Sequence, residues 1–294
     1  MLCGESSYFL IYHKDVWKYY QCRECGLVSL YPRPSNEALL QSYDTYLPAE
    51  PYEIACWKKM IAQVINCSAD LINRRYQAKA GRLLDIGCGY GFFLKKMEQD
   101  GWQVEGIEVS LPWREYAKRE LGLRIHSGPL GKSSFPENSF DAVTLFYVIE
   151  HVHDPKQLLK KVYHILNPGG LLLLRWPHST PVVKALGPFS KRHDIFHTPY
   201  HLYDFNPENM KQLLKQVGFN TIETMIGGHT FPKQRLSLWS SVFFGGLAEL
   251  LYRTTAGKFL LPGVSKTTIA FKNNPWFLVP TLQRENEKSR IIFH

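Results

Sequence analysis

A run of glycines is the part of this sequence best suited to chemistry. It reads Leu83-Leu84-Asp85-Ile86-Gly87-Cys88-Gly89-Tyr90-Gly91 and continues as Phe92-Phe93-Leu94. The apolar residues before it predict a buried strand and those after it a helix start, so the glycines form the turn between them. Glycine lets backbone N–H groups approach a ligand closely. We expect a nucleotide-type site with contacts from Asp85, Gly87, Cys88, Gly89 and Tyr90.

Two carboxylates narrow the choice of ligand. Asp85 lies at the end of its strand, where it would repel a pyrophosphate and attract an ammonium group. Glu108 ends the next predicted strand, with Val109 and Ser110 beside it, at a spacing suited to both hydroxyls of a ribose. The dinucleotide pattern G-x-G-x-x-G is not met, because Phe92 occupies its third glycine position. The expected ligand is therefore a cationic adenosine derivative, and NAD is disfavoured.

The cysteines suggest a second site near the N-terminus. All 6 lie in the first third of the chain, too few for a disulfide scaffold. Cys22-Arg23-Glu24-Cys25-Gly26 is half of a zinc-ribbon pattern, and Cys3 is the remaining cysteine nearby. One hypothesis is zinc bound by Cys3, Cys22, Cys25 and a fourth ligand such as His13 or solvent. A metal-free module is the alternative.

The elements that must position these residues follow from the hydrophobic periodicity. From Gly81 onward, short apolar runs alternate with helical segments. We expect strands at 82–86, 103–108, 140–146, 171–176, 221–226 and 267–271, and helices at 92–99, 113–121, 155–166 and 207–217. This alternation implies parallel strands with crossover helices. The predicted fold is α/β: a doubly wound, Rossmann-like sheet with helices on both faces, plus a small N-terminal Cys-containing module.

Composition shifts along the chain suggest its division into domains. We expect a Cys-containing, zinc-ribbon-like module at 1–34, closed by Pro32-Arg33-Pro34, and a helical cap at 35–80. The main α/β domain covers 81–272 and includes an apolar helical insert at about 230–262. Residues 273–294 form a C-terminal tail.

Overall composition excludes several classes of protein. Of the 294 residues, 45% are hydrophobic and 21% charged, which is typical of a globular chain and not of a disordered one. The net charge of +9 is spread over basic doublets with no long basic run, so nucleic-acid binding is disfavoured. No apolar run is long enough to span a membrane and the N-terminus does not resemble a signal peptide, so a cytoplasmic location is expected.

The apolar segment 236–251 has two interpretations. It contains Trp239 and Phe243 and is flanked by Lys233, Arg235 and Arg253. This pattern suits peripheral contact with a membrane surface. It also suits a helix packed between the last two strands, or the lining of an apolar pocket.

With these motifs in order, the sequence resembles the class I S-adenosylmethionine-dependent methyltransferases, in the small-molecule branch of types 11 and 23. Asp85 to Gly91 resembles the family's first motif, and Glu108-Val109-Ser110 its ribose-binding strand end. Phe140-Asp141-Ala142-Val143 followed by Val148-Ile149-Glu150-His151-Val152 resembles the family's fourth strand and the turn after it. Asn167-Pro168-Gly169-Gly170 resembles the turn into its fifth strand. A subset of this family also carries an N-terminal cysteine module, in which Cys3-Gly4 would be half of the first pair. The usual acidic residue after the third strand is missing at His126-Ser127-Gly128.

The resemblance implies S-adenosylmethionine as cofactor and methyl transfer to an oxygen, carbon or nitrogen of a small-molecule acceptor. Phe146 and Tyr147 would lie beside the methyl group, or else pack in the core. If the acceptor is a hydroxyl, the candidates for taking its proton are Glu150, His151 and His201. For His151 the alternative is a structural hydrogen bond that orients the turn.

Two rival functions stay open at this stage. A non-catalytic or RNA-directed protein that binds S-adenosylmethionine is suggested by the net charge and the cysteine pair. An NAD-dependent oxidoreductase on a similar sheet is opposed by Phe92. The identity of the acceptor and the oligomeric state are not encoded in any motif that we recognise.

Overall fold

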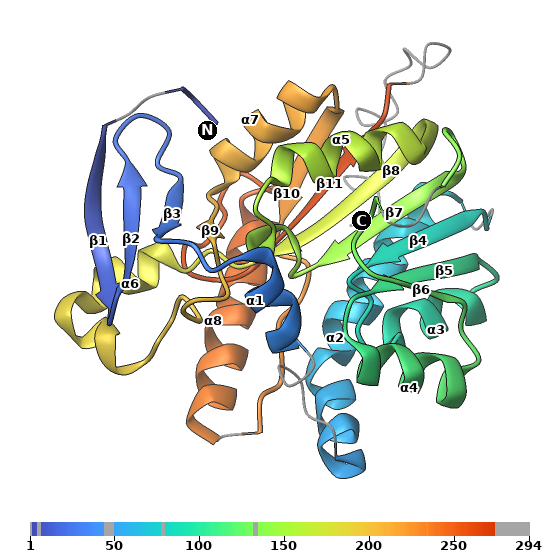
Figure 1. Cartoon of the computed structure of the whole chain (residues 1–294), viewed down its shortest axis with the longest axis horizontal. Coiled ribbons are helices and arrows are strands. Elements are labelled where there is room, and N and C mark those ends of the chain that lie inside the picture. Colours follow the sequence, from blue (N-terminus) through green and yellow to red (C-terminus); the bar gives the residue numbers. More distant parts are fainter. Residues whose placement is uncertain are drawn as a thin grey trace, which may run out of the picture.

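The computed structural model describes residues 2–4, 7–43, 50–77, 80–131, 135–233 and 235–273 (Figure 1). The predicted tail beyond residue 273 lies outside this part of the chain. Among the described residues, no helix is both long and apolar enough to cross a membrane.

The centre of the molecule is a seven-stranded sheet in the order β10-β11-β8-β7-β4-β5-β6. Its neighbours pair in parallel except for β11, which runs antiparallel between β10 and β8. The strands are β4 (Arg82–Ile86), β5 (Gln103–Glu108), β6 (Ile125–Ser127), β7 (Phe140–Phe146), β8 (Leu166–Trp176), β10 (Asn220–Met225) and β11 (Lys266–Phe271). The Rossmann-like sheet predicted from the sequence is confirmed.

Helices cover both faces of this sheet. One face packs against α5 (Pro155–Ile165) and α7 (Pro207–Val217), and the other against α2 (Pro51–Arg75), α3 (Phe92–Gln99) and α4 (Leu111–Leu121). Capping residues set the ends of α7: the Asn206 and Asn209 side chains form a capping box, and Gly218 ends the helix in the left-handed conformation. The remaining helices are α1 (Asn36–Ser42), α6 (Thr180–Leu186) and α8 (Arg235–Thr254), with short 3₁₀ turns η2 (Ile149–His151) and η3 (Gly187–Arg192).

The N-terminal region forms a second, four-stranded antiparallel sheet, β1-β2-β3-β9. Its strands are β1 (Tyr8–Lys14), β2 (Trp17–Cys22), β3 (Val28–Tyr31) and β9 (Tyr203–Asp204). Because β9 comes from far along the chain, the module shares a sheet with the segment that leads into α7. The two regions also share a core, in which Tyr12, Tyr19 and Val28 pack with Phe196 and Leu202.

Candidate active site

The glycine turn has the backbone geometry that a close approach to a ligand requires. Gly87, Gly89 and Gly91 all have positive φ, at 72°, 54° and 79°. A Cβ on Gly87 would lie 2.5 Å from Cγ2 of Val148, so the turn also packs directly on the segment after β7. Helix α3 starts at Phe92, immediately after Gly91. The three glycine positions carry no side chain, so a ligand can approach the backbone closely at the carboxyl edge of the sheet. The Gly87 and Cys88 N–H groups both donate to the Ile107 carbonyl, which fixes the turn against the end of β5.

Glu108 is held against this turn. Its Oε2 accepts a hydrogen bond from the Gly89 N–H at 2.8 Å, and its Oε1 accepts one from the Ser110 N–H at 2.9 Å. Burial raises the pKa of Glu108, although these amides favour the charged form. Each carboxylate oxygen has a second lone pair, so both can still accept a ribose hydroxyl. The fixed carboxylate therefore fits the ribose role expected for it.

Asp85 fits a cationic ligand. It is only 2% exposed, and its Oδ1 accepts a 2.7 Å hydrogen bond from the Thr144 hydroxyl. Burial raises its pKa to about 8, against the effect of Thr144 and with a further contribution from Glu108. A positive group bound nearby would reverse that shift. The residues present are therefore suited to an adenosine ligand that carries a positive charge.

The other predicted cofactor residues lie around the same edge, but not all present their side chains to it. The Cys88 sulfur packs against Gly106 of β5, and the Tyr90 ring lies against Trp113 and Tyr116 of α4. The side chains of Cys88 and Tyr90 therefore pack against β5 and α4. Val109 is half-buried beside Glu108, and its carbonyl accepts a 3.5 Å hydrogen bond from Arg114. The Ser110 side chain is fully buried and its N–H holds Glu108.

Phe146 is the last residue of β7 and Tyr147 follows it, and both are half-buried. The Phe146 ring packs on Phe93 of α3, with centroids 4.7 Å apart. Tyr147 has a positive φ of 55°, which is uncommon for a residue with a side chain, and its hydroxyl accepts a 3.0 Å hydrogen bond from Nε of Arg175. The turn therefore aims the two aromatic rings in different directions.

The three predicted proton acceptors come together. One potential ligand atom from each of Glu150, His151 and His201 lies within 4.8 Å of the others. Glu150 is fully buried, and burial raises its pKa to about 8; neither of its carboxylate oxygens has a hydrogen-bond partner among the described residues. Burial lowers the pKa of His151 to about 4 and that of His201 well below its usual range. At pH 7 the cluster is therefore neutral.

Hydrogen bonds fix the orientation of this cluster. His151 Nδ1 lies 3.0 Å from the Tyr200 carbonyl, and the Leu202 N–H donates to the Glu150 carbonyl at 2.8 Å. Since a carbonyl can only accept, Nδ1 carries the hydrogen in the neutral ring and Nε2 carries the lone pair. The His197 ring lies beside that of His201, with ring centroids 5.1 Å apart. The segment that carries His197 and His201 is a turn-rich loop.

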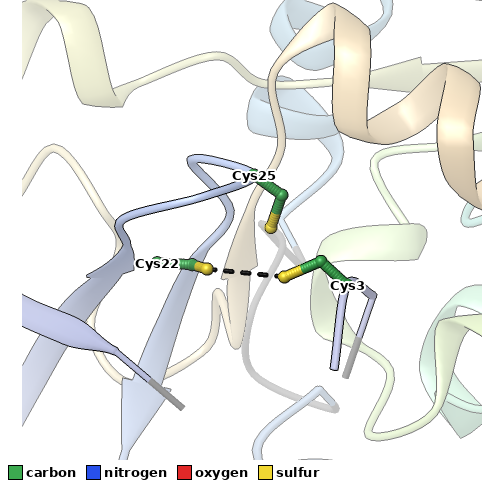
Figure 2. A group of neighbouring side chains, drawn as sticks. All are labelled: Cys3, Cys22 and Cys25. Carbon is green, nitrogen blue, oxygen red and sulfur yellow. Dashed lines mark hydrogen bonds between the residues drawn. The ribbon is translucent and has the colours of Figure 1, made fainter. Parts of the chain in front are cut away.

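The three cysteines also meet (Figure 2). The sulfurs of Cys3, Cys22 and Cys25 all lie within 4.8 Å of one another, and Cys3 and Cys22 are 3.5 Å apart. Burial opposes ionisation of Cys22, but hydrogen bonds from the backbone at Cys25 and Glu24 outweigh it, and its pKa is lowered. Amides directed at a sulfur are suited to a thiolate that binds a metal.

His13 is wrong as the fourth ligand of this group. In the register of β1 and β2, Cys22 is opposite Tyr8 whereas His13 is opposite Lys18. Five residues of strand separate His13 from Tyr8, a distance of about 16 Å. Within the described part of the chain, no further His, Cys, Asp or Glu joins the three cysteines. A complete tetrahedral site would need a solvent molecule or a ligand from elsewhere.

Arg175 is a residue near the site that the sequence reasoning missed. It lies on β8, only 2% exposed, and one of its nitrogens donates to the Ile226 and Gly227 carbonyls and to the Thr267 hydroxyl. The other terminal nitrogen donates to the Gly228 carbonyl at 2.8 Å. The sequence signal that could have identified it is a charged residue directly after a run of four leucines, at the end of a strand predicted to be buried. Arg175 joins Tyr147 to the segment after β10.

Comparison with known proteins agrees with this geometry. The sequence model of a methyltransferase domain family matches residues 58–224. A probable S-adenosylmethionine-dependent methyltransferase of Mycolicibacterium smegmatis is 29% identical over 174 residues, 58% of this chain and 59% of that protein. A ubiquinone biosynthesis O-methyltransferase of Xanthomonas oryzae is 31% identical over 124 residues, 40% of this chain and 52% of that protein. The chain thus spans between half and three fifths of the length of these relatives.

A solved structure shows the same fold. A methyltransferase of Thermotoga maritima, described as a possible histamine N-methyltransferase, superposes with a TM-score of 0.52 at 17% identity, over 80% of this chain and 100% of that one. Fold and site together define a Rossmann-like protein built for an adenosine-type cofactor. The family match covers more than half of the chain, and the chain belongs to the class I S-adenosylmethionine-dependent methyltransferase family. S-adenosylmethionine is the cofactor of that family.

Proposed function

We propose that this protein transfers a methyl group from S-adenosylmethionine to a hydroxyl of a small-molecule acceptor. The observation that carries the proposal is the neutral, buried cluster of Glu150, His151 and His201 at the turn after β7. Its neighbour Val148 contacts the glycine turn, so the cluster and the cofactor motif share one edge of the sheet. Relatives named as ubiquinone biosynthesis O-methyltransferases support an oxygen acceptor.

Within this proposal each group has a separate task. Glu108 binds the ribose, Asp85 attracts the amino-acid end of the cofactor, and Gly87 and Gly89 provide close backbone contact. The bound cofactor supplies an electrophilic methyl group, so holding the acceptor in line accounts for most of the rate. His151 accepts the hydroxyl proton at Nε2, and His201 and Glu150 surround the resulting charge.

The cofactor part is tested by calorimetric titration of S-adenosylhomocysteine into wild-type protein and into the variant Glu108→Ala. We expect the variant to bind at least tenfold more weakly, because it loses the acceptor for the ribose hydroxyls. Glu115→Ala is the matched control, since the Glu115 side chain on α4 is 44% exposed and forms a 3.7 Å ion pair with Lys118. Equal affinity in all three proteins would contradict the assignment of Glu108.

The acceptor class is tested by following S-adenosylhomocysteine release with a panel of phenols, catechols and primary amines. Turnover should require a hydroxyl and should fall at least a hundredfold in His151→Gln, while cofactor affinity is unchanged. Turnover with amines alone would replace oxygen by nitrogen as the acceptor. Cofactor binding without turnover on any compound, together with a salt-dependent RNA gel shift, would favour the RNA-directed alternative.

We also propose that Cys3, Cys22 and Cys25 bind a structural zinc ion. Support comes from their convergence and from the amides directed at Cys22. Purified protein should contain about one zinc per chain, and a chelator should lower its melting temperature. Cys25→Ser should lose the metal, whereas Cys56→Ser, on α2, should keep it. Protein that contains no zinc after growth in zinc-supplemented medium would contradict this site.

A further inference from the structure

Helix α8 has an apolar face that is open to solvent. Trp239, Phe243 and Leu250 are 75%, 63% and 58% exposed. They are separated by four and seven residues, so they lie along one face of the helix. Gly246 continues the same face, and a Cβ there would meet no atom within 4 Å. The helical spacing thus places several exposed apolar side chains on one face, whereas surface hydrophobics that are scattered singly are normal.

The opposite face of α8 already has its contacts. Ala248 is fully buried, and a Cβ on Gly245 would lie 2.5 Å from His229. The Ser241 hydroxyl donates to the Thr230 carbonyl. The segment before α8 is in turn held to α2, because Phe231 N–H donates to the Met60 carbonyl at 2.9 Å. The helix is therefore anchored through its inner face, and the outer residues are not part of that packing.

The charged residues of the segment that contains α8 are mostly positive. Residues 233–258 contain four basic residues, Lys233, Arg235, Arg253 and Lys258, and one acidic residue, Glu249. Glu249 forms a 2.9 Å ion pair with Arg253. At the other end of the helix, the Lys233 ammonium lies 4.5 Å from the ring centre of Tyr52, itself 74% exposed. The apolar face is thus bordered by cations at both ends.

The helix lies at the edge of the sheet that carries the candidate active site. Strand β10 runs parallel to β8, because both are antiparallel to β11. The segment that leads from β10 into α8 therefore leaves the sheet at the carboxyl edge, where the glycine turn and the Glu150 turn lie. In Figure 1, α8 and the first turns of α2 extend together beyond that edge.

We propose that α8 docks the protein on an anionic lipid surface. Trp239, Phe243 and Leu250 insert at the headgroup level, where tryptophan is favoured, and Lys233, Arg253 and Lys258 contact lipid phosphates. A second copy of the chain fits less well, because two such faces would bring their cationic borders together. This docking does not depend on the proposed function. It would place the carboxyl edge of the sheet, which carries the candidate active site, close to acceptors dissolved in the membrane.

The test is sedimentation of the full chain with vesicles of phosphatidylcholine containing 30% phosphatidylglycerol, compared with vesicles of phosphatidylcholine alone. The variant Trp239→Ser/Phe243→Ser should bind the anionic vesicles at least tenfold more weakly. Phe189→Ser is the matched control, since Phe189 is 65% exposed but lies in η3. It should bind like the wild type.

A second variant tests the electrostatic part without removing any apolar residue. Lys233→Glu/Lys258→Glu should weaken binding about tenfold at low salt and less at high salt, because surface charges are screened. Failure of the wild type to sediment with the anionic vesicles, or equal binding by the wild type and both variants, would overturn the proposal. A concentration-dependent dimer that the Trp239→Ser/Phe243→Ser variant abolishes, without vesicle binding by the wild type, would replace the membrane by a second copy.

Discussion

At the scale of single residues, the two buried carboxyl groups Asp85 and Glu150 differ in their hydrogen bonds. Asp85 and Glu150 both have their pKa raised to about 8 by burial. Asp85 accepts a hydrogen bond from Thr144, whereas the Glu150 oxygens have no partner among the described residues. A raised pKa in the folded state means that folding favours the protonated carboxyl. The contribution of Glu150 to the free energy of unfolding is therefore full below its unfolded pKa of about 4.3. It decreases above that pH and is lost as the pH rises through the folded pKa of about 8.

Glu150→Gln tests this argument. Glutamine has the shape of the protonated carboxyl and cannot ionise, so the variant should not lose stability over that range of pH. Its free energy of unfolding should match the wild type near pH 4 and exceed it by on the order of 4 to 5 kcal/mol near pH 8. Urea titrations at several pH values measure the difference, in which the contribution of Asp85 cancels. A constant difference between pH 4 and 8 would show that Glu150 ionises normally.

At the scale of elements, Arg175 connects β8 to the segment between β10 and α8. Its guanidinium donates to three consecutive carbonyls at 226–228 and to the Thr267 hydroxyl. Arg175→Met would leave these acceptors buried without donors, and we expect a loss of about 3 kcal/mol or more in the free energy of unfolding. Arg253→Met, on the exposed face of α8, should change it by less than about 0.5 kcal/mol. Similar urea midpoints for the two variants would contradict this role.

Elements with local signals were predictable from the sequence. The strand 82–86, the glycine turn and the helix 92–99 were predicted at their observed bounds, since apolar runs and glycines specify each one locally. Helix 207–217 was equally clear, with Pro207 at its start and Gly218 at its end. Glu108 could be assigned to the end of a strand because β5 carries the same kind of signal.

Elements that depend on distant partners were not predictable. The strands β1, β2 and β3 were not recognised, and β9 has only two residues and exists through its pairing with β3. The convergence of His201 with Glu150 depends on this pairing and on the Leu202 hydrogen bond, neither of which has a local pattern. Arg175 was not predicted because its partners are mainly backbone carbonyls. Every residue has a carbonyl, so no residue type in the sequence indicates which ones Arg175 contacts.

At the scale of the whole molecule, the loop at residues 193–202 contacts both the N-terminal sheet and the turn after β7. Tyr19 of β2 is fully buried, and its hydroxyl donates to the His201 carbonyl at 2.9 Å. The Tyr19 ring stacks on Phe196, with centroids 4.3 Å apart, and Lys14 pairs with Asp194 at 2.9 Å. The module therefore positions the loop that carries His201. It should affect methyl transfer separately from cofactor binding.

Tyr19→Phe tests this separation by removing one hydroxyl and keeping the ring. The His201 carbonyl then lacks its donor, and we expect kcat to fall about three- to tenfold while the Kd for S-adenosylhomocysteine changes less than twofold. Tyr20→Phe is the control, because successive residues of a strand point to opposite faces and Tyr20 is only half-buried. Steady-state kinetics and calorimetry on the three proteins measure both quantities. Equal kcat in all three, or a parallel loss of cofactor affinity in Tyr19→Phe, would mean that the N-terminal sheet does not position the loop for catalysis.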